Sequence, residues 1–423
     1  MDLYAETGGK NATIVTGMAD REQAIKHVVH SAFSHGGQKC SATSLLLLES
    51  EVYDDPEFRR MLLDAVDSIR VGSAWRLDSK MGPLIRPPSG DLETALKTLE
   101  PGESWALLPK QIEGNARLWT PGIKWGVQPG SYTHSTEFFG PVLGVMRFEN
   151  LNEAIALVNQ TGYGLTSGLE TLDDREQEIW KAGIRAGNLY INRPTTGAIV
   201  LRQPFGGMGK SCYGPGMKAG GPNYVAQFMR LTSRSPGPSS EHIATAVASI
   251  DRACEEEFSA VQDHFHLLGQ DNFRRYLPVR NLKIRVHHDD SEFDIAVRVA
   301  AAAAVGCQPV VSAPSNLAEK VQATVANAKT ERAVEIIVES DADLIATILG
   351  GETNRLRFGA PDRVGVEIRT AAAANGTCVC DAPVVGEGRV ELLWYVQEQS
   401  ISIDYHRYGN LGARADESRV GPV

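Results

Sequence analysis

A chain of 423 residues is long enough for two or three domains, and its hydrophobic content of 42% is ordinary for a globular protein. The formal net charge of -10 argues against a nucleic-acid partner, which would require basic patches, and no apolar run approaches the ~20 residues that cross a bilayer. Six cysteines over this length predict free thiols rather than a disulfide framework, and residues 1–4 lack the basic start of a signal peptide, so we expect a cytoplasmic protein.

The first half of the chain alternates between helical and strand patterns. Asp20 is the expected N-cap of a helix over 21–34, and residues 43–48 are typical of a buried strand. Further helices are expected over 56–69, 92–99, 152–159 and 175–186, and further strands within 120–130 and over 142–148 and 188–192. This alternation predicts α/β packing.

The composition of residues 233–240 (SRSPGPSS) predicts a linker, which divides the chain into regions 1–232 and 241–423. A second α/β pattern follows it. Strands are expected over 282–286, 308–312 and 334–338, and helices over 292–304, 316–328 and 341–349. No phosphate-binding loop and no catalytic constellation occur there, so this Rossmann-like domain is interpreted as a structural or lid domain.

Two short segments carry the chemistry. Cys40 stands among small residues in Gly36-Gly37-Gln38-Lys39-Cys40-Ser41, and Glu6 opens Glu6-Thr7-Gly8-Gly9-Lys10. A thiolate needs an exposed site with close backbone approach, which glycines allow. A carboxylate held apart from it can later act as a general base on water. The pair therefore suits covalent catalysis followed by hydrolysis.

Four blocks together resemble the aldehyde dehydrogenase superfamily. The Glu6 and Cys40 segments resemble its general-base and nucleophile motifs, Glu137-Phe138-Phe139-Gly140-Pro141 its cofactor-ribose motif, and Pro204–Gly209 its late glycine-rich signature. The resemblance implies an aldehyde dehydrogenase catalytic domain with NAD as cofactor. It also implies that most of the nucleotide-binding domain would lie upstream of Glu6, so we expect this chain to be the C-terminal portion of a longer enzyme.

The subfamily can be narrowed. Thr196-Gly197-Ala198 is similar to the substrate-anchoring loop of glutamate-semialdehyde (pyrroline-5-carboxylate) dehydrogenases. Residues 210–224 and the tail 390–409 resemble the long forms of bifunctional proline-oxidising enzymes, in which FAD would belong only to an absent proline dehydrogenase domain. This resemblance implies oxidation of L-glutamate γ-semialdehyde to glutamate with NAD, the second step of proline catabolism, and a homo-oligomeric full-length parent.

The resemblance also implies a role for each candidate residue. The Cys40 thiolate would attack the aldehyde carbon to give a thiohemiacetal, hydride transfer to the nicotinamide would give a thioester, and Glu6 would activate water to release the acid. Glu137 would accept from both ribose hydroxyls, and Phe139 would pack on the nicotinamide. The substrate-binding residues would be the backbone N–H groups of Gly197 and Ala198, the Ser41 hydroxyl, and Phe205 over the aliphatic part of the substrate.

Two other functions remain open from the sequence. The chain could belong to a different aldehyde dehydrogenase, or it could be a catalytically silent module for folding or assembly. No metal is expected, because Cys378 and Cys380 have no second pair at ligand spacing. His287 and His288 beside Asp289 are interpreted as a solvated turn rather than as a metal site.

Overall fold

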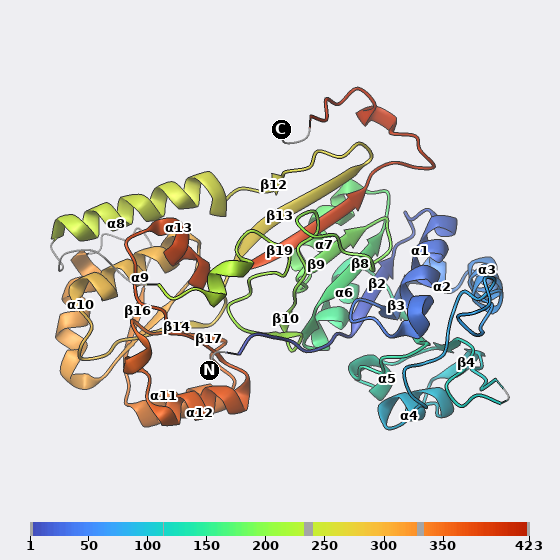
Figure 1. Ribbon diagram of the computed structural model, residues 1–423, viewed down its shortest axis with the longest axis horizontal. Coiled ribbons are helices and arrows are strands. Elements are labelled where there is room, and N and C mark those ends of the chain that lie inside the picture. The colour runs from blue at the N-terminus through green and yellow to red at the C-terminus, as the bar shows by residue number, and fades with distance from the viewer. Residues whose placement is uncertain (1–2, 113, 232–239, 328–333, 421–423) are drawn as a thin grey trace. The chain divides into compact units, whose positions relative to one another are not determined.

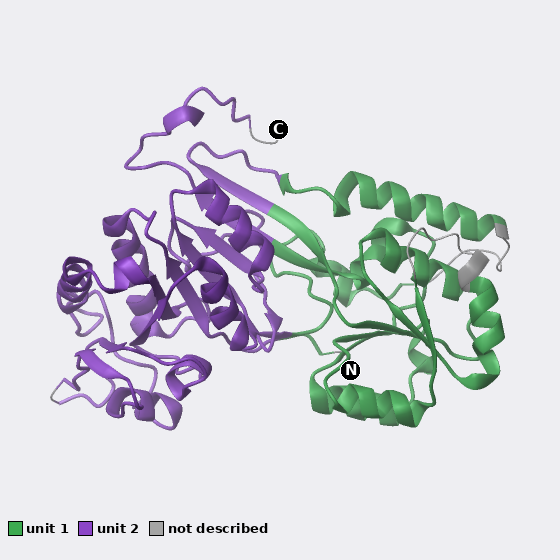
Figure 2. Cartoon of the chain, turned by 180° about the vertical axis from the view of Figure 1, so that it is seen from behind, with its two compact units in different colours: residues 1–5, 213–262, 274–399 green, residues 6–212, 263–273, 400–423 purple. Residues whose placement is uncertain are grey.

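The computed structural model describes residues 3–112, 114–231, 240–327 and 334–420 (Figure 1). Residues 233–239 of the predicted linker lie outside this part, and Ser240 begins helix α8 (Ser240–Ala253). The chain divides into two compact units that interleave along the sequence (Figure 2). Unit 1 comprises residues 1–5, 213–262 and 274–399, and unit 2 comprises 6–212, 263–273 and 400–423. Strands β13 (Gln270–Pro278) and β19 (Val396–Asp404) each contribute residues to both units.

Unit 2 is built on a mainly parallel sheet whose strands run in the order β19-β9-β8-β2-β3-β6-β5-β4. Only the pairing of β4 with β5 is antiparallel among these neighbours. The bounds are β2 (Asn11–Val15), β3 (Thr43–Glu49), β4 (Ser104–Leu107), β5 (Gly122–Trp125), β6 (Val142–Phe148), β8 (Thr166–Glu170) and β9 (Asn188–Ile191). On the other side of β19 lie β13 and β12 (Gln262–Asp263).

The four consecutive leucines of β3 show how the sheet is covered on both faces. Leu45 and Leu47 pack into one cluster with α6 (Leu151–Gln160) and α7 (Asp174–Gly183). Leu46 and Leu48 pack into another with α1 (Arg21–Phe33) and α3 (Pro56–Asp67). Successive side chains of a strand point to opposite faces, so an unbroken apolar run requires helices on both sides.

Local signals set the helix boundaries of unit 2. The Asp20 carboxylate accepts from the N–H of Gln23, as expected for an N-cap, and Pro56 occupies the first turn of α3 behind the capping Asp55. Shorter helices are α2 (Ser50–Tyr53), α4 (Asp91–Lys97) and α5 (Tyr132–Ser135). The predicted helices and strands of the first half are all found, with ends that differ by a few residues.

Unit 1 contains a five-stranded parallel sheet in the order β16-β15-β14-β17-β18. The strands are β14 (Leu282–Arg285), β15 (Val310–Ala313), β16 (Glu335–Val338), β17 (Arg355–Arg357) and β18 (Cys378–Cys380). Helix α9 (Glu292–Ala304) packs with both α8 and α10 (Ala318–Asn327), and α11 (Asp341–Leu349) packs with α12 (Val366–Asn375). The chain starts at the central β14 and winds outward in both directions, which is the doubly wound pattern of a Rossmann-like domain.

Three arginines lie in the interior of unit 1. Arg298, Arg355 and Arg357 are almost wholly buried. The Arg355 guanidinium donates to the carbonyls of Trp394 and Pro215, and Arg357 forms an ion pair with Glu391 in α13 (Gly388–Glu391). The tail segment 390–409 thus begins with a buried anion and continues into strand β19. Within the described residues, no helix is both long and apolar enough to cross a membrane.

Candidate active site

Cys40 lies in a turn that connects the 3-10 segment Ser34–Gly37 to strand β3, and its side chain is exposed. The chain turns sharply there, since His35, Gly36 and Gly37 all have positive φ angles. A β-carbon on Gly37 would lie 2.3 Å from the carbonyl oxygen of Gly140. Glycine is therefore required at this position, both for the backbone conformation and for the close approach.

Asn11, the first residue of β2, is hydrogen-bonded to the backbone of the turn that carries Cys40. Its side-chain amide donates to the carbonyl oxygens of Cys40 at 2.6 Å and Ala42 at 3.0 Å. Its Oδ1 accepts from the N–H of Thr166 at 3.0 Å, so Asn11 joins β2 both to the turn and to the neighbouring strand β8. Asn11 is 2% exposed, and its hydrogen bonds hold the backbone of Cys40 in place.

A chain of buried hydroxyls supports the other side of the turn. Thr13, Thr43 and Thr195 are joined through their Oγ1 atoms at 2.9 and 3.1 Å. Thr195 Oγ1 also lies 3.0 Å from the carbonyl oxygen of Ser41, to which it donates. The segment that leads to Gly197 and the turn that carries Cys40 are thereby connected through one hydrogen-bond network.

Two carboxylates act on the thiol. Burial raises the pKa of Cys40 above its usual value, and the negative charges of Glu6 and Glu137 raise it further, against backbone hydrogen bonds that lower it. The thiol is therefore mostly protonated near neutral pH. The structure thus brings together Cys40, Glu6 and Glu137, although they come from three separate segments of the sequence.

Glu6 is exposed at the end of the short strand β1 (Ala5–Glu6). Its Oε2 accepts from the N–H of Gly207 at 3.0 Å, and the N–H of Thr7 donates to the carbonyl of Ser211. The late glycine-rich signature Pro204–Gly209 therefore holds the carboxylate of the first motif. One oxygen is anchored, and the exposed side chain can still meet water.

Glu137 is held by the glycines of the same first motif. The N–H of Gly9 donates to Glu137 Oε1 at 3.1 Å, and a β-carbon on Gly8 would lie 2.2 Å from Glu137 Oε2. Burial raises the pKa of Glu137, and the Gly9 hydrogen bond and the charge of Lys10 oppose that rise. Phe139 follows with a φ of 54° and is 40% exposed.

A small hollow opens between these segments. Its walls include Gly9, Thr43, Glu137 and Phe139. A half-buried carboxylate that faces a hollow, with an exposed aromatic ring beside it, fits a ribose that donates two hydroxyls and a planar ring that stacks. Glu137 and Phe139 are thus placed where they could hold the nicotinamide end of NAD.

The predicted substrate loop is exposed, and the side chain of Gln203 bonds back to its backbone. Gly197 has a φ of 91°, and Gly197 and Ala198 are both exposed. Gln203 accepts from the N–H of Ile199 through Oε1 at 3.1 Å and donates to Asn272 through Nε2 at 2.8 Å. Backbone N–H groups in an exposed loop of this kind can bind a carboxylate.

The two remaining predicted substrate residues are less open to solvent. Phe205 is half-buried, and Ser41 is 7% exposed. Their roles stay predictions. The sequence interpretation missed Asn11, Thr195 and Gln203, which support the site without belonging to its motifs. The one signal for Asn11 was a polar residue at the start of Asn11-Ala12-Thr13-Ile14-Val15, a short segment with β-branched residues that follows Lys10.

Replacing Asn11 with alanine should lower the free energy of unfolding by about 2–3 kcal/mol, because the carbonyls of Cys40 and Ala42 and the N–H of Thr166 lose their partner. It should also lower aldehyde turnover by about tenfold, since the turn that carries Cys40 loosens. Urea denaturation and NADH formation measure the two effects. Asn152→Ala on the exposed face of α6 is the matched control. Equal stability and turnover of the two variants would contradict the role of Asn11 in holding the Cys40 turn.

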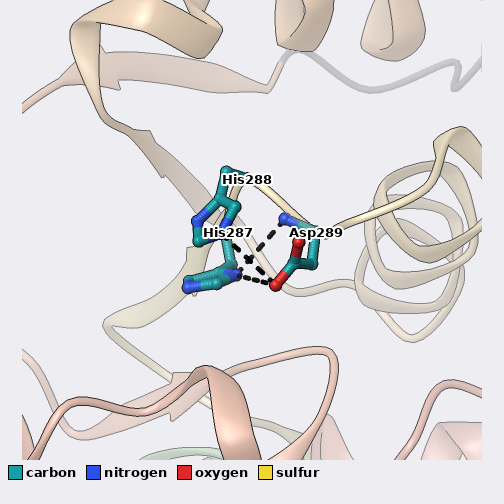
Figure 3. A group of neighbouring side chains, drawn as sticks. All are labelled: His287, His288 and Asp289. Carbon is teal, nitrogen blue, oxygen red and sulfur yellow. Dashed lines mark hydrogen bonds and ion pairs between the residues drawn. The ribbon is translucent and has the colours of Figure 1, made fainter.

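The histidine cluster of unit 1 lies just after β14 (Figure 3). His287 Nδ1 and His288 Nε2 each lie 3.4 Å from Asp289 Oδ2, and the three ligand atoms fall within 4.8 Å. However, His287 Nδ1 already accepts from the N–H of Asp289 at 3.3 Å (Figure 3). A metal would have to displace that bond, so the solvated turn stays the preferred prediction for this cluster.

The fold and this arrangement of thiol and carboxylates define a family. Residues 1–233 match the model of the aldehyde dehydrogenase family, and the chain belongs to that family. The predicted family and α/β fold class are thereby confirmed.

Individual relatives extend the similarity beyond residue 233. The bifunctional protein PutA of Klebsiella aerogenes is 31% identical over 446 aligned residues, which cover 95% of this chain and 32% of the relative. A solved structure of proline utilization A (PutA) from Corynebacterium freiburgense superposes with a TM-score of 0.81 at 38% identity, over 97% of this chain and 40% of that one. The 1-pyrroline-5-carboxylate dehydrogenase of Bacillus subtilis is 35% identical over 236 residues, 55% of this chain and 45% of the relative. The chain therefore spans less than half the length of these relatives.

Proposed function

We propose that this chain carries the cysteine-dependent aldehyde oxidation site of an NAD-dependent L-glutamate γ-semialdehyde dehydrogenase, which produces glutamate in proline catabolism. The observation that carries the proposal is the exposed thiol of Cys40 on a turn held by hydrogen bonds. The charges of Glu6 and Glu137 act on this thiol, and each carboxylate accepts from a backbone N–H. The similarity to proteins named PutA and 1-pyrroline-5-carboxylate dehydrogenase supports the choice of substrate.

Each residue has a defined part in this chemistry. The exposed thiol of Cys40 releases its proton to solvent, the resulting thiolate attacks the aldehyde carbon, and the backbone N–H of Cys40 can bind the oxygen that becomes negative. Bound NAD supplies a hydride acceptor, with Glu137 and Phe139 orienting the nicotinamide end. Glu6 then removes a proton from water, which attacks the thioester and releases the acid.

The far end of the substrate carries a carboxylate. The exposed N–H groups of Gly197 and Ala198 would bind it, together with the Ser41 hydroxyl, and Phe205 would cover the aliphatic carbons. We infer that region 1–232 carries this catalytic site, while 241–423 is a structural or lid domain. Six free cysteines are consistent with a reducing cytoplasm, and assembly into homo-oligomers in the full-length parent is inferred from the family resemblance.

The test is to supply the 423-residue chain with NAD and L-glutamate γ-semialdehyde and to follow NADH by absorbance and NAD binding by calorimetry. Oxidation of the semialdehyde in preference to propanal supports the proposal. A preference for propanal would support a different aldehyde dehydrogenase. Absence of both binding and turnover would contradict catalysis and favour a folding or assembly module.

Replacing Glu6 with glutamine should affect turnover and thiol reactivity in opposite directions. Turnover should fall by about 10²–10³-fold, because water loses its general base. Alkylation of Cys40 by iodoacetamide at pH 8 should become faster, because a negative charge that raises the pKa of the thiol has gone. Mass spectrometry of the alkylated peptide measures the second effect. Slower alkylation together with slower turnover would instead indicate that the variant distorts the turn.

A further inference from the structure

Lys10 is a buried cation that lacks a hydrogen-bond acceptor. It closes the motif that begins at Glu6 and stands directly before β2, and it is 2% exposed. Its Nζ has no hydrogen-bond partner among the described residues and lies 4.2 Å from the centroid of the Phe138 ring. Burying an ammonium group in this way is costly, and a methionine would fill the same space without that cost.

A second lysine nearby shows what is missing at Lys10. Lys124 lies on the same aromatic ring, with its Nζ 5.8 Å from the centroid of Phe138. It has partners of its own, since its Nζ lies 3.4 Å from Glu103 and donates to Thr133 at 3.1 Å. The local requirement for a buried positive charge beside Glu103 is therefore met without Lys10.

The anion that favours the charge of Lys10 most strongly is Glu137. The two segments run side by side, because Gly9 donates to Glu137 while the next residue, Lys10, packs over Phe138. Burial lowers the pKa of Lys10 to about 7, and the charge of Glu137 opposes this shift. Conversely, the charge of Lys10 lowers the pKa of Glu137, which burial raises.

The other charged groups around Lys10 are few. Glu103 favours its protonation and Lys124 opposes it. The buried His134 is also close, but its Nδ1 accepts from the N–H of Gly130 at 2.8 Å, so the ring is neutral and donates through Nε2 to the carbonyl of Leu157 at 2.9 Å. Glu137 is thus the one anion near Lys10 that has no other cation assigned to it in the described part of the site.

We propose that Lys10 is a positioning residue for the cofactor: a buried counter-ion that keeps the Glu137 carboxylate ionised and aimed at the ribose hydroxyls of the nicotinamide nucleotide. This inference rests on the proposed function and assigns to it a residue that touches neither substrate nor cofactor. Because Lys10 loses its proton near neutral pH, the Lys10–Glu137 pair turns from neutral to negative as the pH rises. Affinity for the anionic NAD should then weaken, by about fivefold across this transition.

The pairing can be tested without any ligand. In the chain labelled at lysine Cε, one resonance should titrate near pH 7 and be absent from Lys10→Met. In Glu137→Gln its midpoint should fall by about one pH unit or more, since the stabilising charge has gone. Lys26→Met, on the exposed face of α1, should leave it unchanged. An unshifted midpoint in Glu137→Gln, or a Lys10 that titrates with the surface lysines, would overturn the proposal.

Thermal unfolding gives a second, independent readout. The pKa of Lys10 in the folded chain, about 7, lies below the ordinary lysine value of 10.5, so the unfolded chain binds more protons between these values. Lys10 therefore destabilises the fold increasingly as the pH falls from 10.5 to about 7, and the penalty then levels off. Lys10→Met should melt at a higher temperature than the unaltered chain, with a difference that is larger at pH 7 than at pH 9.5. A difference that does not depend on pH would indicate simple packing.

Cofactor binding separates this inference from the proposed function. At pH 6, where Lys10 is charged, Lys10→Met should raise the Kd or KM for NAD by about fivefold while kcat at saturating NAD stays within about twofold. The loss of affinity on raising the pH through 7 should also disappear in this variant. Unchanged affinity would overturn the role of Lys10. Absence of NAD binding in the unaltered chain would contradict the proposed function instead, and the resonance of Lys10 in Glu137→Gln would still decide the pairing.

Discussion

Replacing Cys40 with alanine should reduce aldehyde oxidation by more than about 10⁴-fold, because the covalent intermediate from which hydride leaves forms on its sulfur. The neighbouring carboxylates and the backbone donors would remain in place, so substrate and cofactor affinity should change little. NADH formation at saturating substrate, with calorimetric titration of NAD into the variant, measures the two quantities separately.

The control is Cys254→Ala, which removes a half-buried thiol of unit 1 and should leave turnover intact. In the unaltered chain, alkylation of Cys40 should accelerate by about tenfold per pH unit from pH 7 to 9, because its pKa lies above the usual value and only the thiolate reacts. Substantial turnover by Cys40→Ala would refute covalent catalysis at this residue. Resistance of Cys40 to alkylation at pH 9 would refute its accessibility.

Replacing Glu391 with alanine should destabilise the fold by about 3–5 kcal/mol. Both partners of the Arg357–Glu391 ion pair are wholly buried in unit 1, with nitrogen and oxygen 2.8 Å apart. Glu391 also accepts from the hydroxyl of Tyr395 at 2.7 Å and from the N–H of Val385 at 3.1 Å. In the unaltered chain, burial lowers the pKa of Arg357, and the charge of Glu391 helps to raise it. Removing Glu391 leaves this buried guanidinium without a counter-ion.

Urea denaturation followed by circular dichroism measures this loss, with each unit allowed its own transition. The double variant Arg357→Met/Glu391→Met is the informative control, because it removes both charges and keeps similar volumes. It should recover most of the lost stability. If the free energy of unfolding of Glu391→Ala stayed within about 1 kcal/mol of that of the unaltered chain, water would have to reach Arg357 and replace the carboxylate.

Local signals in the sequence were enough for many elements of the fold. The predicted cap at Asp20, the proline at the start of α3 and the leucine run of β3 all appear where expected, because each depends on a few neighbouring residues. Strand β2 was not predicted, because Asn11 and Thr13 interrupt its apolar residues. Strands β13 and β19 were missed as well, although both are long. Polar residues inside them hide the alternation that a strand with one solvated face would show.

The sequence by itself determined the family and predicted the reactive groups, because a thiol and a carboxylate among glycines have few other uses, and their order along the chain is specific. Only the tertiary structure decided what holds those groups. Asn11 reaches the carbonyl of Cys40, Gly207 binds Glu6, and Gly9 binds Glu137, all through contacts between residues far apart in the chain. Burial is likewise set by tertiary packing. The sequence around Lys10 does not distinguish a solvated lysine from one whose charge depends on a carboxylate contributed by a distant segment.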